Sequence, residues 1–196
     1  MYTQRKVIST PILEMLHLVY LIIVLVILAI VVPIFSVLPS ARQRQQMKMR
    51  QAARAAGVSV DLMMIDDPNP EQDKYIAHTG RNIPARLKVV GYRIQRRRPK
   101  GWHQLPQIQW SLKRKLDGSW LWNSNGGRLS SELENFLEEA KEALPQDVEQ
   151  VEESFHTIVV YWHERTADSE DNVLNFLLKC ADLPLYDSPS EEIHKS

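Results

Sequence analysis

Residues 18–38 read LVYLIIVLVILAIVVPIFSVL, a run without a charged or amide side chain. A bilayer core of about 30 Å needs roughly 20 apolar residues in a helix, and the run is long enough to supply them. A cleaved signal peptide has an apolar region of only about 7–15 residues, so this run is too long for one. The sequence therefore predicts a transmembrane helix at 18–38, preceded by a short amino-terminal tail at 1–17.

Basic residues flank this run unequally. Arg5 and Lys6 precede it, whereas five basic residues and no acidic one follow within about 16 residues, namely Arg42, Arg44, Lys48, Arg50 and Arg54. Because positively charged flanks stay on the cytoplasmic side, we expect the amino terminus outside and the carboxyl-terminal domain in the cytoplasm. The solitary Cys180 is consistent with a reducing compartment.

The segment 39–56 is predicted to be a basic juxtamembrane helix. Its residues from 41 onward are rich in good helix formers and include no Gly or Pro until Gly57. Because its apolar stripe consists mostly of alanines, which bury little area, we interpret the helix as a stalk outside the domain. Its basic residues either hold anionic lipid headgroups or only set the orientation. The domain itself is expected at 57–186, with a flexible tail at 187–196.

The 24 basic and 24 acidic residues cancel only in sum. Residues 41–128 carry 18 basic and 6 acidic residues, a net charge of +12, whereas 129–196 carry 4 and 17, a net charge of −13. Hydrophobic residues make up 44% of the chain, which is too many for a disordered protein. A single cysteine excludes an intramolecular disulfide and a cysteine-based zinc cluster.

The basic half has the alternation of a sheet. Apolar residues recur at every second position in 58–64, 87–94 and 108–113, which predicts strands. Asp117-Gly118 then precedes Trp120-Leu121-Trp122 and predicts a two-residue hairpin turn. In that register Lys115 lies opposite Trp120 and Lys113 opposite Trp122, so that lysine stems cover both indoles.

The acidic half is expected to be helical except for one strand. Ser131 and Glu134 fit a capping box at the start of a helix that runs to Pro145. Residues 156–163 are apolar on both alternations and predict a central strand. Asp168, Glu170 and Asp171 favour the start of a second helix, whose wide apolar face includes Cys180. The sequence thus predicts an α+β fold, with a small antiparallel or mixed sheet packed against two main helices.

No motif of a catalytic, metal or cofactor site is found in the sequence. A glycine-rich phosphate loop, paired cysteines, His-Glu-x-x-His and a Gly-x-Ser-x-Gly elbow are all missing. The six histidines are dispersed. We therefore predict no catalytic residue, no metal ligand and no cofactor, and an enzyme with an unrecognised site is the remaining alternative.

Basic residues and tryptophans gather in the predicted sheet half and suggest a partner. They could bind anionic lipid, a protein partner or, least favoured, nucleic acid. The favoured interpretation is internal: the acidic half docks on the basic half, or on that of a neighbour in a homo-oligomer. Together with the juxtamembrane residues, the candidate lipid- or partner-binding set is Arg42, Arg44, Lys48, Arg50, Arg54, Arg96, Arg97, Arg98, Lys113, Lys115, Trp120 and Trp122.

The layout also resembles a known group of proteins. The residues that carry the likeness are Leu38-Pro39-Ser40-Ala41-Arg42-Gln43-Arg44 after the anchor, then Arg50, Ala53-Arg54, Gly57-Val58, Gly118-Ser119-Trp120-Leu121-Trp122 and Tyr161-Trp162. This pattern resembles uncharacterised single-pass inner-membrane proteins of gammaproteobacteria, sometimes labelled as the preprotein translocase subunit YajC. The resemblance covers most of the chain and implies no assigned activity. The long acidic half of this chain departs from the true translocase subunit. A non-enzymatic interaction or scaffold module is therefore the main prediction, and a role in protein translocation is the alternative.

Overall fold

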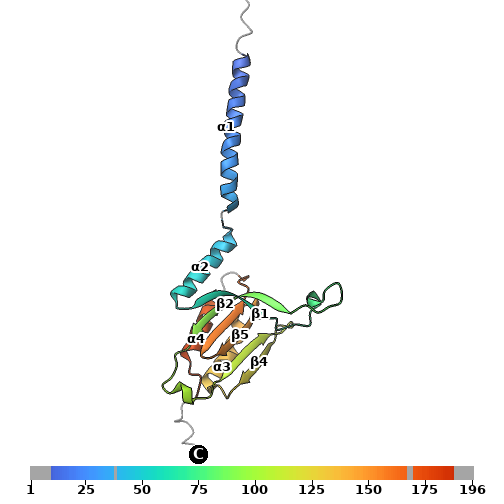
Figure 1. The fold of residues 1–196 in the computed structure, drawn as a ribbon. Coiled ribbons are helices and arrows are strands. Elements are labelled where there is room, and N and C mark those ends of the chain that lie inside the picture. The colour runs from blue at the N-terminus through green and yellow to red at the C-terminus, as the bar shows by residue number, and fades with distance from the viewer. Residues whose placement is uncertain (1–9, 38, 167–169, 188–196) are drawn as a thin grey trace, which may run out of the picture. The chain divides into compact units, whose positions relative to one another are not determined.

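The computed structural model describes residues 10–37, 39–166 and 170–187. The chain divides into two compact units, Met1–Arg44 and Gln45–Ser196, and Figure 1 shows their elements. In the first unit, helix α1 (Thr10–Val37) contains the stretch Met15–Pro33, which is long and apolar enough to cross a membrane. The predicted apolar helix is confirmed, and its membrane insertion stays a prediction. The end of the predicted span at Leu38, Asp168 and most of the predicted tails lie outside the described residues.

Helix α2 (Ala41–Ala55) ends where the sequence predicts. Gly57 has a φ of 83°, and the amide of Val58 donates to Ala53 O at 2.9 Å while that of Gly57 donates to Arg54 O at 3.0 Å. These two bonds are a Schellman motif, which needs a left-handed residue and therefore favours glycine. Met49 and Ala53 are 3% and 2% exposed in the main core. The interpretation of this helix as a stalk is therefore wrong for its second half, and the folded unit begins at Gln45 rather than Gly57.

Six antiparallel strands form one sheet in the order β1-β2-β6-β5-β3-β4. The α+β class is confirmed, and the sheet is wholly antiparallel. The predicted apolar strand becomes β6, which lies between β2 and β5 and is central, as expected. The strands are β1 (Ser59–Asp66), β2 (Arg86–Gln95), β3 (Gln109–Arg114), β4 (Trp120–Asn125), β5 (Val148–Ser154) and β6 (Thr157–Trp162).

Strand β5 corrects the expectation that the acidic half has one strand. The register between β5 and β6 shifts between Val148 and Gln150, so an extra residue interrupts the alternation. Val148 and Val151 are both fully buried although they are three positions apart, a spacing that belongs to a helix rather than to a regular strand. Because of this irregular pairing, the apolar residues of β5 do not alternate regularly, and the strand was not predicted from the sequence.

The β3–β4 hairpin differs from the predicted register by one residue. The amide of Lys115 donates to Ser119 O at 2.8 Å, and Gly118 has a φ of 84°. The loop therefore holds three residues with glycine in the left-handed position, the common alternative to a two-residue turn. As a result Arg114, not Lys115, lies opposite Trp120, and its guanidinium carbon is 4.3 Å from that ring centroid. Lys113 lies opposite Leu121.

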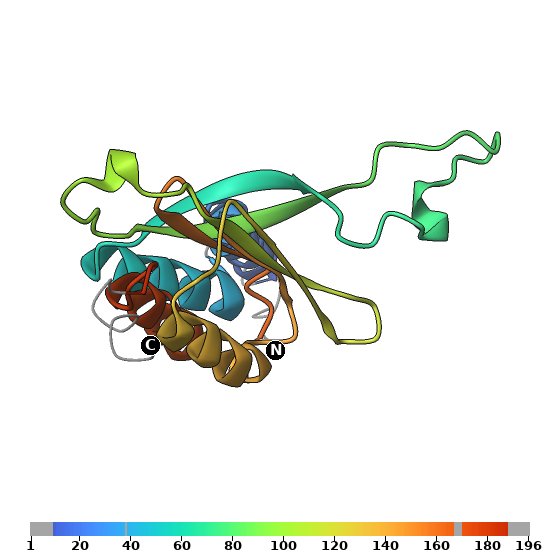
Figure 2. The same cartoon turned by 90° about the horizontal axis from the view of Figure 1, so that it is seen from below.

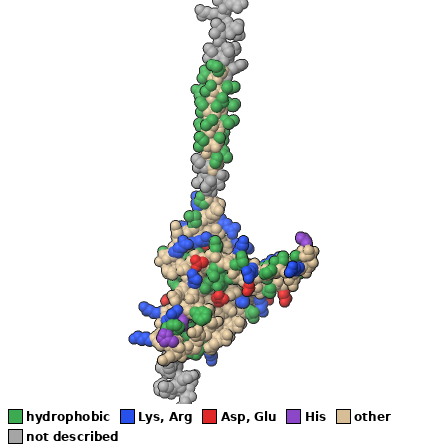
Figure 3. Space-filling view, in the orientation of Figure 1, with side chains coloured by type: hydrophobic (Ala, Val, Ile, Leu, Met, Phe, Trp, Pro, Cys, Tyr) green, Lys and Arg blue, Asp and Glu red, His purple; other side chains and the backbone are tan. Residues whose placement is uncertain are grey.

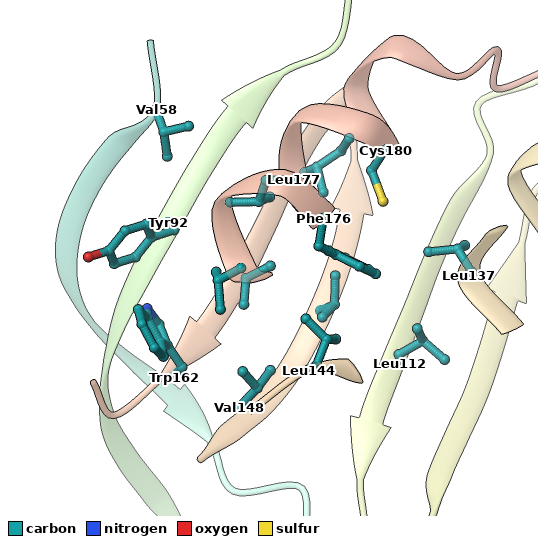
Figure 4. Close-up of a cluster of buried hydrophobic side chains, with 14 of the residues drawn as sticks. Val58, Tyr92, Leu112, Leu137, Leu144, Val148, Trp162, Phe176, Leu177 and Cys180 are labelled. Atoms are coloured by element: carbon teal, nitrogen blue, oxygen red, sulfur yellow. The ribbon is translucent and has the colours of Figure 1, made fainter. Parts of the chain in front are cut away.

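Two helices complete the domain, α3 (Ser131–Ala140) and α4 (Glu170–Asp182). The cap of α3 is Ser130, whose hydroxyl accepts from Leu133 N at 3.2 Å, so the predicted capping box at Ser131 is wrong by one residue. The apolar faces of both helices are buried as predicted, and Leu133, Leu177 and Cys180 have no exposed surface. Figure 4 shows part of this core between helix and sheet.

The helices leave one face of the sheet uncovered. Helices α2, α3 and α4 lie on the same side of the strands in Figure 2. On the opposite side Val89, Val159 and Tyr161 form a second small cluster with Met63 and neighbouring apolar side chains. This layout places the larger core on one side of the sheet only.

A long loop, residues 67–85, connects β1 to β2. The buried carboxylate of Asp67 organises its base, since Tyr75 Oη donates to it at 2.6 Å and Asn69 N at 2.7 Å, with Lys74 Nζ 3.0 Å away. Burial raises the pKa of Asp67, but these donors outweigh it and hold the pKa below its usual value. These contacts fix the conformation of the loop base.

Candidate interaction surface

Within the second unit, the predicted candidate residues do not form one surface. Arg42 and Arg44 are exposed at the start of α2, in the first unit, and Lys48 and Arg54 are exposed farther along that helix. Arg50, between them, has a structural partner in Glu164, described below. The basic juxtamembrane residues therefore divide into exposed charges and one charge bound within the folded unit.

Arg50 attaches α2 to the end of β6. Its Nε donates to Glu164 Oε1 at 2.9 Å and its Nη2 to Oε2 at 2.5 Å. Tyr92 Oη donates to the same carboxylate at 2.9 Å, and the Glu164 side chain is 1% exposed. The hydrogen bond to Glu164 raises the pKa of Arg50. A guanidinium fork on a carboxylate gives both strength and fixed orientation.

Arg96 is a core residue, which corrects its placement in an exposed basic run. It is 4% exposed, and its Nε and Nη2 donate to the two carboxylate oxygens of Glu153 at 2.6 and 2.8 Å. Its Nη1 also donates to Leu183 O. Glu153 in turn accepts from Trp110 Nε1 at 2.8 Å. The pair satisfies the hydrogen-bonding groups of both charges inside the core.

The hairpin candidates lie in three different environments. Trp122 stacks on Trp110 with ring centroids 5.8 Å apart, and both pack against the core with Trp120. Lys115 is exposed beside the hairpin loop. Lys113 alternates with the buried Leu112 along β3, so it points to the uncovered face. These residues therefore cannot serve as one binding site.

Arg97 and Arg98 belong to a group that the sequence did not bring together. Three segments contribute this group: the segment after β2, the β5–β6 turn and the segment after α4. We name the group the basic-aromatic patch. In Figure 3 basic, histidine and hydrophobic side chains gather over the first of these segments, at the lower left. Its contacting members are Arg98, Trp102, His103, Phe155, His156 and Tyr186, and we include the exposed Arg97 and Lys100, which flank Arg98 in the sequence.

Aromatic contacts hold the patch together. The guanidinium carbon of Arg98 lies 4.5 Å from the Trp102 ring centroid, a cation-π distance. His156 meets Trp102 edge-on at 5.8 Å and Tyr186 at 6.4 Å. Tyr186 Oη donates to Pro106 O at 2.8 Å. Arg98, Trp102, Phe155, His156 and Tyr186 help to line a hollow of about 120 Å³.

The β5–β6 turn presents its aromatic residue in a strained conformation. Ser154 pairs with Thr157, so the turn has two central residues, Phe155 and His156, with φ values of 52° and 61°. Two left-handed central residues define a type I′ turn, which favours Asn and Gly. Phe155 is nevertheless 63% exposed. Neither residue is a usual turn former, so this turn has no local sequence signature.

Replacing Phe155 with Asn is expected to stabilise the protein by about 1 kcal/mol, because Asn accepts the left-handed conformation more readily than Phe does. Little burial is lost, since the ring is largely exposed. Urea unfolding of wild type and variant measures the difference. Leu121→Asn is the matched control, because Leu121 is 49% exposed and lies in a regular strand. A stabilised control or a destabilised Phe155→Asn protein would contradict the assignment of strain.

His156 makes stability depend on pH. Burial lowers its pKa, and the charges of Arg98 and Arg96 lower it further against the opposing effect of Glu153. The unfolded chain therefore binds the proton more readily. The stabilising contribution is present above the unfolded pKa of about 6.5 and is lost as the pH falls toward the lowered folded value.

We expect the thermal midpoint of wild type to fall from about pH 7.5 to about pH 5.5 more than that of His156→Asn. Asn suits the left-handed turn position, so the variant keeps the turn while removing the titration. His103→Asn, which changes an exposed histidine of the same patch, serves as control and keeps the wild-type slope. Parallel pH profiles for wild type and His156→Asn would show that His156 does not cause the pH dependence of stability.

The described residues include no group of three or more His, Cys, Asp or Glu side chains placed to hold a metal ion. Burial raises the pKa of the Cys180 thiol well above its usual range, which disfavours the reactive thiolate. Comparison with known proteins found no match to a family model, a curated protein or a solved structure.

Proposed function

We propose that this protein is a single-pass inner-membrane protein whose cytoplasmic α+β domain is a non-enzymatic protein-interaction module. We further propose that the basic-aromatic patch binds an acidic segment of a protein partner that carries an apolar side chain. The observation that carries the proposal is Phe155, a large exposed ring kept at a turn position that favours Asn or Gly. Strain that persists beside a hollow with polar and aromatic walls is a feature of binding sites.

Charge supports an acidic occupant. Arg97, Arg98 and Lys100 are exposed at the patch, whereas the nearby Glu153 is enclosed by its pairing with Arg96. Among the described residues, none of these three forms an ion pair with an acidic side chain, so the patch presents positive charge around an apolar centre. Such a surface steers an acidic partner toward it and fixes the partner through aromatic contacts.

The acidic helical half leaves these basic residues exposed. The acidic residues of α3 include Glu132, Glu138 and Glu139, which are exposed, while Arg97 and Arg98 are exposed on a different segment. Buried ion pairs between the halves involve Arg50 and Arg96 instead. This separation favours an external partner over internal neutralisation as the role of the patch.

A photo-reactive phenylalanine analogue at position 155 of the full-length protein tests the proposal in intact cells. We expect illumination to yield a protein adduct, and we expect Arg97→Gln, Arg98→Gln and Lys100→Gln together to reduce it strongly. The same analogue at position 121, an exposed apolar site on β4, is the control. Equal adduct yields at both positions would overturn the proposal. So would a yield that is unchanged in the triple Gln variant.

Anionic lipid is the competing occupant, because arginines beside tryptophan also suit a membrane interface. Flotation of residues 45–196 with phosphatidylglycerol-containing vesicles, against phosphatidylcholine vesicles, distinguishes the two. Flotation that depends on Arg98 and Trp102 would replace the protein partner with a lipid surface. A role in protein translocation stays a prediction of the sequence resemblance.

The orientation is tested separately with reporter fusions at the carboxyl terminus. The proposal expects a reporter that is active in the cytoplasm, because the basic residues that follow α1 outnumber those before it. An active periplasmic reporter at that position would reverse the orientation while leaving the patch unaffected.

A further inference from the structure

Strand β1 is an edge strand with an unusual surface. It pairs with β2 through eight uninterrupted residue pairs, from Ser59↔Arg93 to Asp66↔Arg86, and ends the sheet on its other side. Among the described residues, no hydrogen bond outside this ladder reaches its backbone. Leu62 and Met64 are 80% and 55% exposed on this strand. A row of backbone donors and acceptors is therefore open beside exposed apolar side chains.

Edge strands of soluble proteins usually carry features that prevent pairing with another strand, and β1 has few of them besides Asp61 and Asp66. The sequence Ser59–Asp66 includes no Pro, Lys or Gly, and its register shows no bulge. Strand β4, at the opposite edge, ends instead in the polar run Asn123-Ser124-Asn125. A long, regular, apolar edge is a template for adding another strand.

We propose that β1 pairs with β1 of a second copy of this chain, in antiparallel orientation with Leu62 at the two-fold axis, to make one continuous twelve-stranded sheet. This inference is independent of what the basic-aromatic patch binds. Val60, Leu62 and Met64 lie on one face of the strand, whereas Ser59 and Asp61 share the other face with Met63 and Ile65, so a partner strand must be apolar on the first face. Strand β1 itself has this pattern.

The proposed register matches apolar side chains across the seam. With Leu62 opposite its own copy, Val60 of each chain lies opposite Met64 of the other, because opposed residues share one face. A hollow of about 350 Å³, whose lining includes Leu62, Met64, Val90 and Trp162, lies at this edge and can take part of the added apolar surface. The register thus buries the side chains that are now most exposed.

Charge does not oppose the pairing. The two acidic residues of the strand, Asp61 and Asp66, are 2.8 and 3.9 Å from Arg93 and Arg86 on β2. In the proposed register Asp61 lies opposite Met63, so acidic side chains do not face each other directly. A two-fold axis perpendicular to the sheet also keeps the helix-covered faces of both copies on one side, and confinement of both copies by their membrane helices would raise their effective concentration.

Oxidative cross-linking of the full-length protein in membranes tests the register. We expect Leu62→Cys to give about tenfold more disulfide-linked dimer than Leu121→Cys, because residues opposed across the axis come within disulfide distance. Leu121 is the matched control, an exposed leucine on the other edge strand. Wild type controls for the buried Cys180. Equal yields at both positions would overturn the proposed register.

The second measurement is the molar mass of the detergent-solubilised full-length protein by light scattering. Wild type is expected to be dimeric. Leu62→Lys, which places two like charges at the axis, should raise the dimer dissociation constant about tenfold or more, whereas Leu121→Lys should not. Circular dichroism confirms that each variant is folded. A monomeric wild type, or a Leu62→Lys protein as dimeric as wild type, would exclude β1 pairing and leave the patch proposal intact.

Discussion

Replacing Arg96 with Met is expected to destabilise the domain by about 3–5 kcal/mol. The variant leaves the carboxylate of Glu153, which is fully buried, without its bidentate partner. It also removes the donor to Leu183 O, and a buried carbonyl that loses its donor costs further free energy. Because a domain of this size has only about 5–15 kcal/mol of stability, the variant should show a much lower thermal midpoint by circular dichroism.

The neighbouring Arg97→Met is the matched control for this change. Arg97 is exposed, so its loss should change the free energy of unfolding by less than about 0.5 kcal/mol. The double variant Arg96→Met with Glu153→Gln should recover part of the stability, since the amide oxygen still accepts from Trp110 and no charge stays unpaired. A double variant no more stable than Arg96→Met would show that the unpaired charge of Glu153 is not the cause of the destabilisation.

Beginning the chain at Gly57 is expected to leave a domain that does not fold cooperatively, whereas a chain that begins at Gln45 should fold. The shorter chain lacks the buried Met49 and Ala53 and leaves Glu164 buried without Arg50. Loss of a methionine from a core costs about 2–5 kcal/mol, and the unpaired carboxylate adds to it, although partial exposure of Arg50 reduces that part. Amide proton spectra and thermal unfolding of residues 45–196 and 57–196 make the comparison.

Point variants in the full-length protein separate the two contributions of α2. Met49→Ala tests the packing, and Arg50→Gln tests the ion pair. Lys48→Gln and Arg54→Gln are controls on the exposed side of the same helix and should leave unfolding unchanged. Two shortened chains of equal thermal stability would mean that α2 adds nothing to the domain.

Much of the fold is predictable because single elements have strong local patterns. The apolar stripe of α3, the buried face of α4 and the two-sided apolar strand β6 each follow from one period. The predictions of strand position and register are wrong where one inserted residue changes the alternation of apolar side chains. The bulge in β5 and the three-residue loop before β4 each shift the pattern by one position, and the sequence carries no local sign of either.

The candidate site was less predictable than the fold. Arg96, Arg97 and Arg98 are identical residues in one run, yet Arg96 alone enters the core, because Glu153 on β5 faces it. A contact over 57 positions has no local sequence signature. Phe155 and His156 were missed for a related reason, since their turn conformation is imposed by the pairing of β5 with β6 rather than by their own preferences.

The contact between α2 and the end of β6 also determines when the domain can complete its fold during translation. Arg50 and Glu164 are 114 positions apart, and a ribosome adding about 5–20 residues per second needs on the order of 10 s to cover that distance. During this interval the apolar side of α2 has already left the ribosome, while the strand that binds it has not been synthesised. The domain therefore completes its core late in translation, and nascent chains released early would expose Met49 and Ala53 to chaperones or proteases.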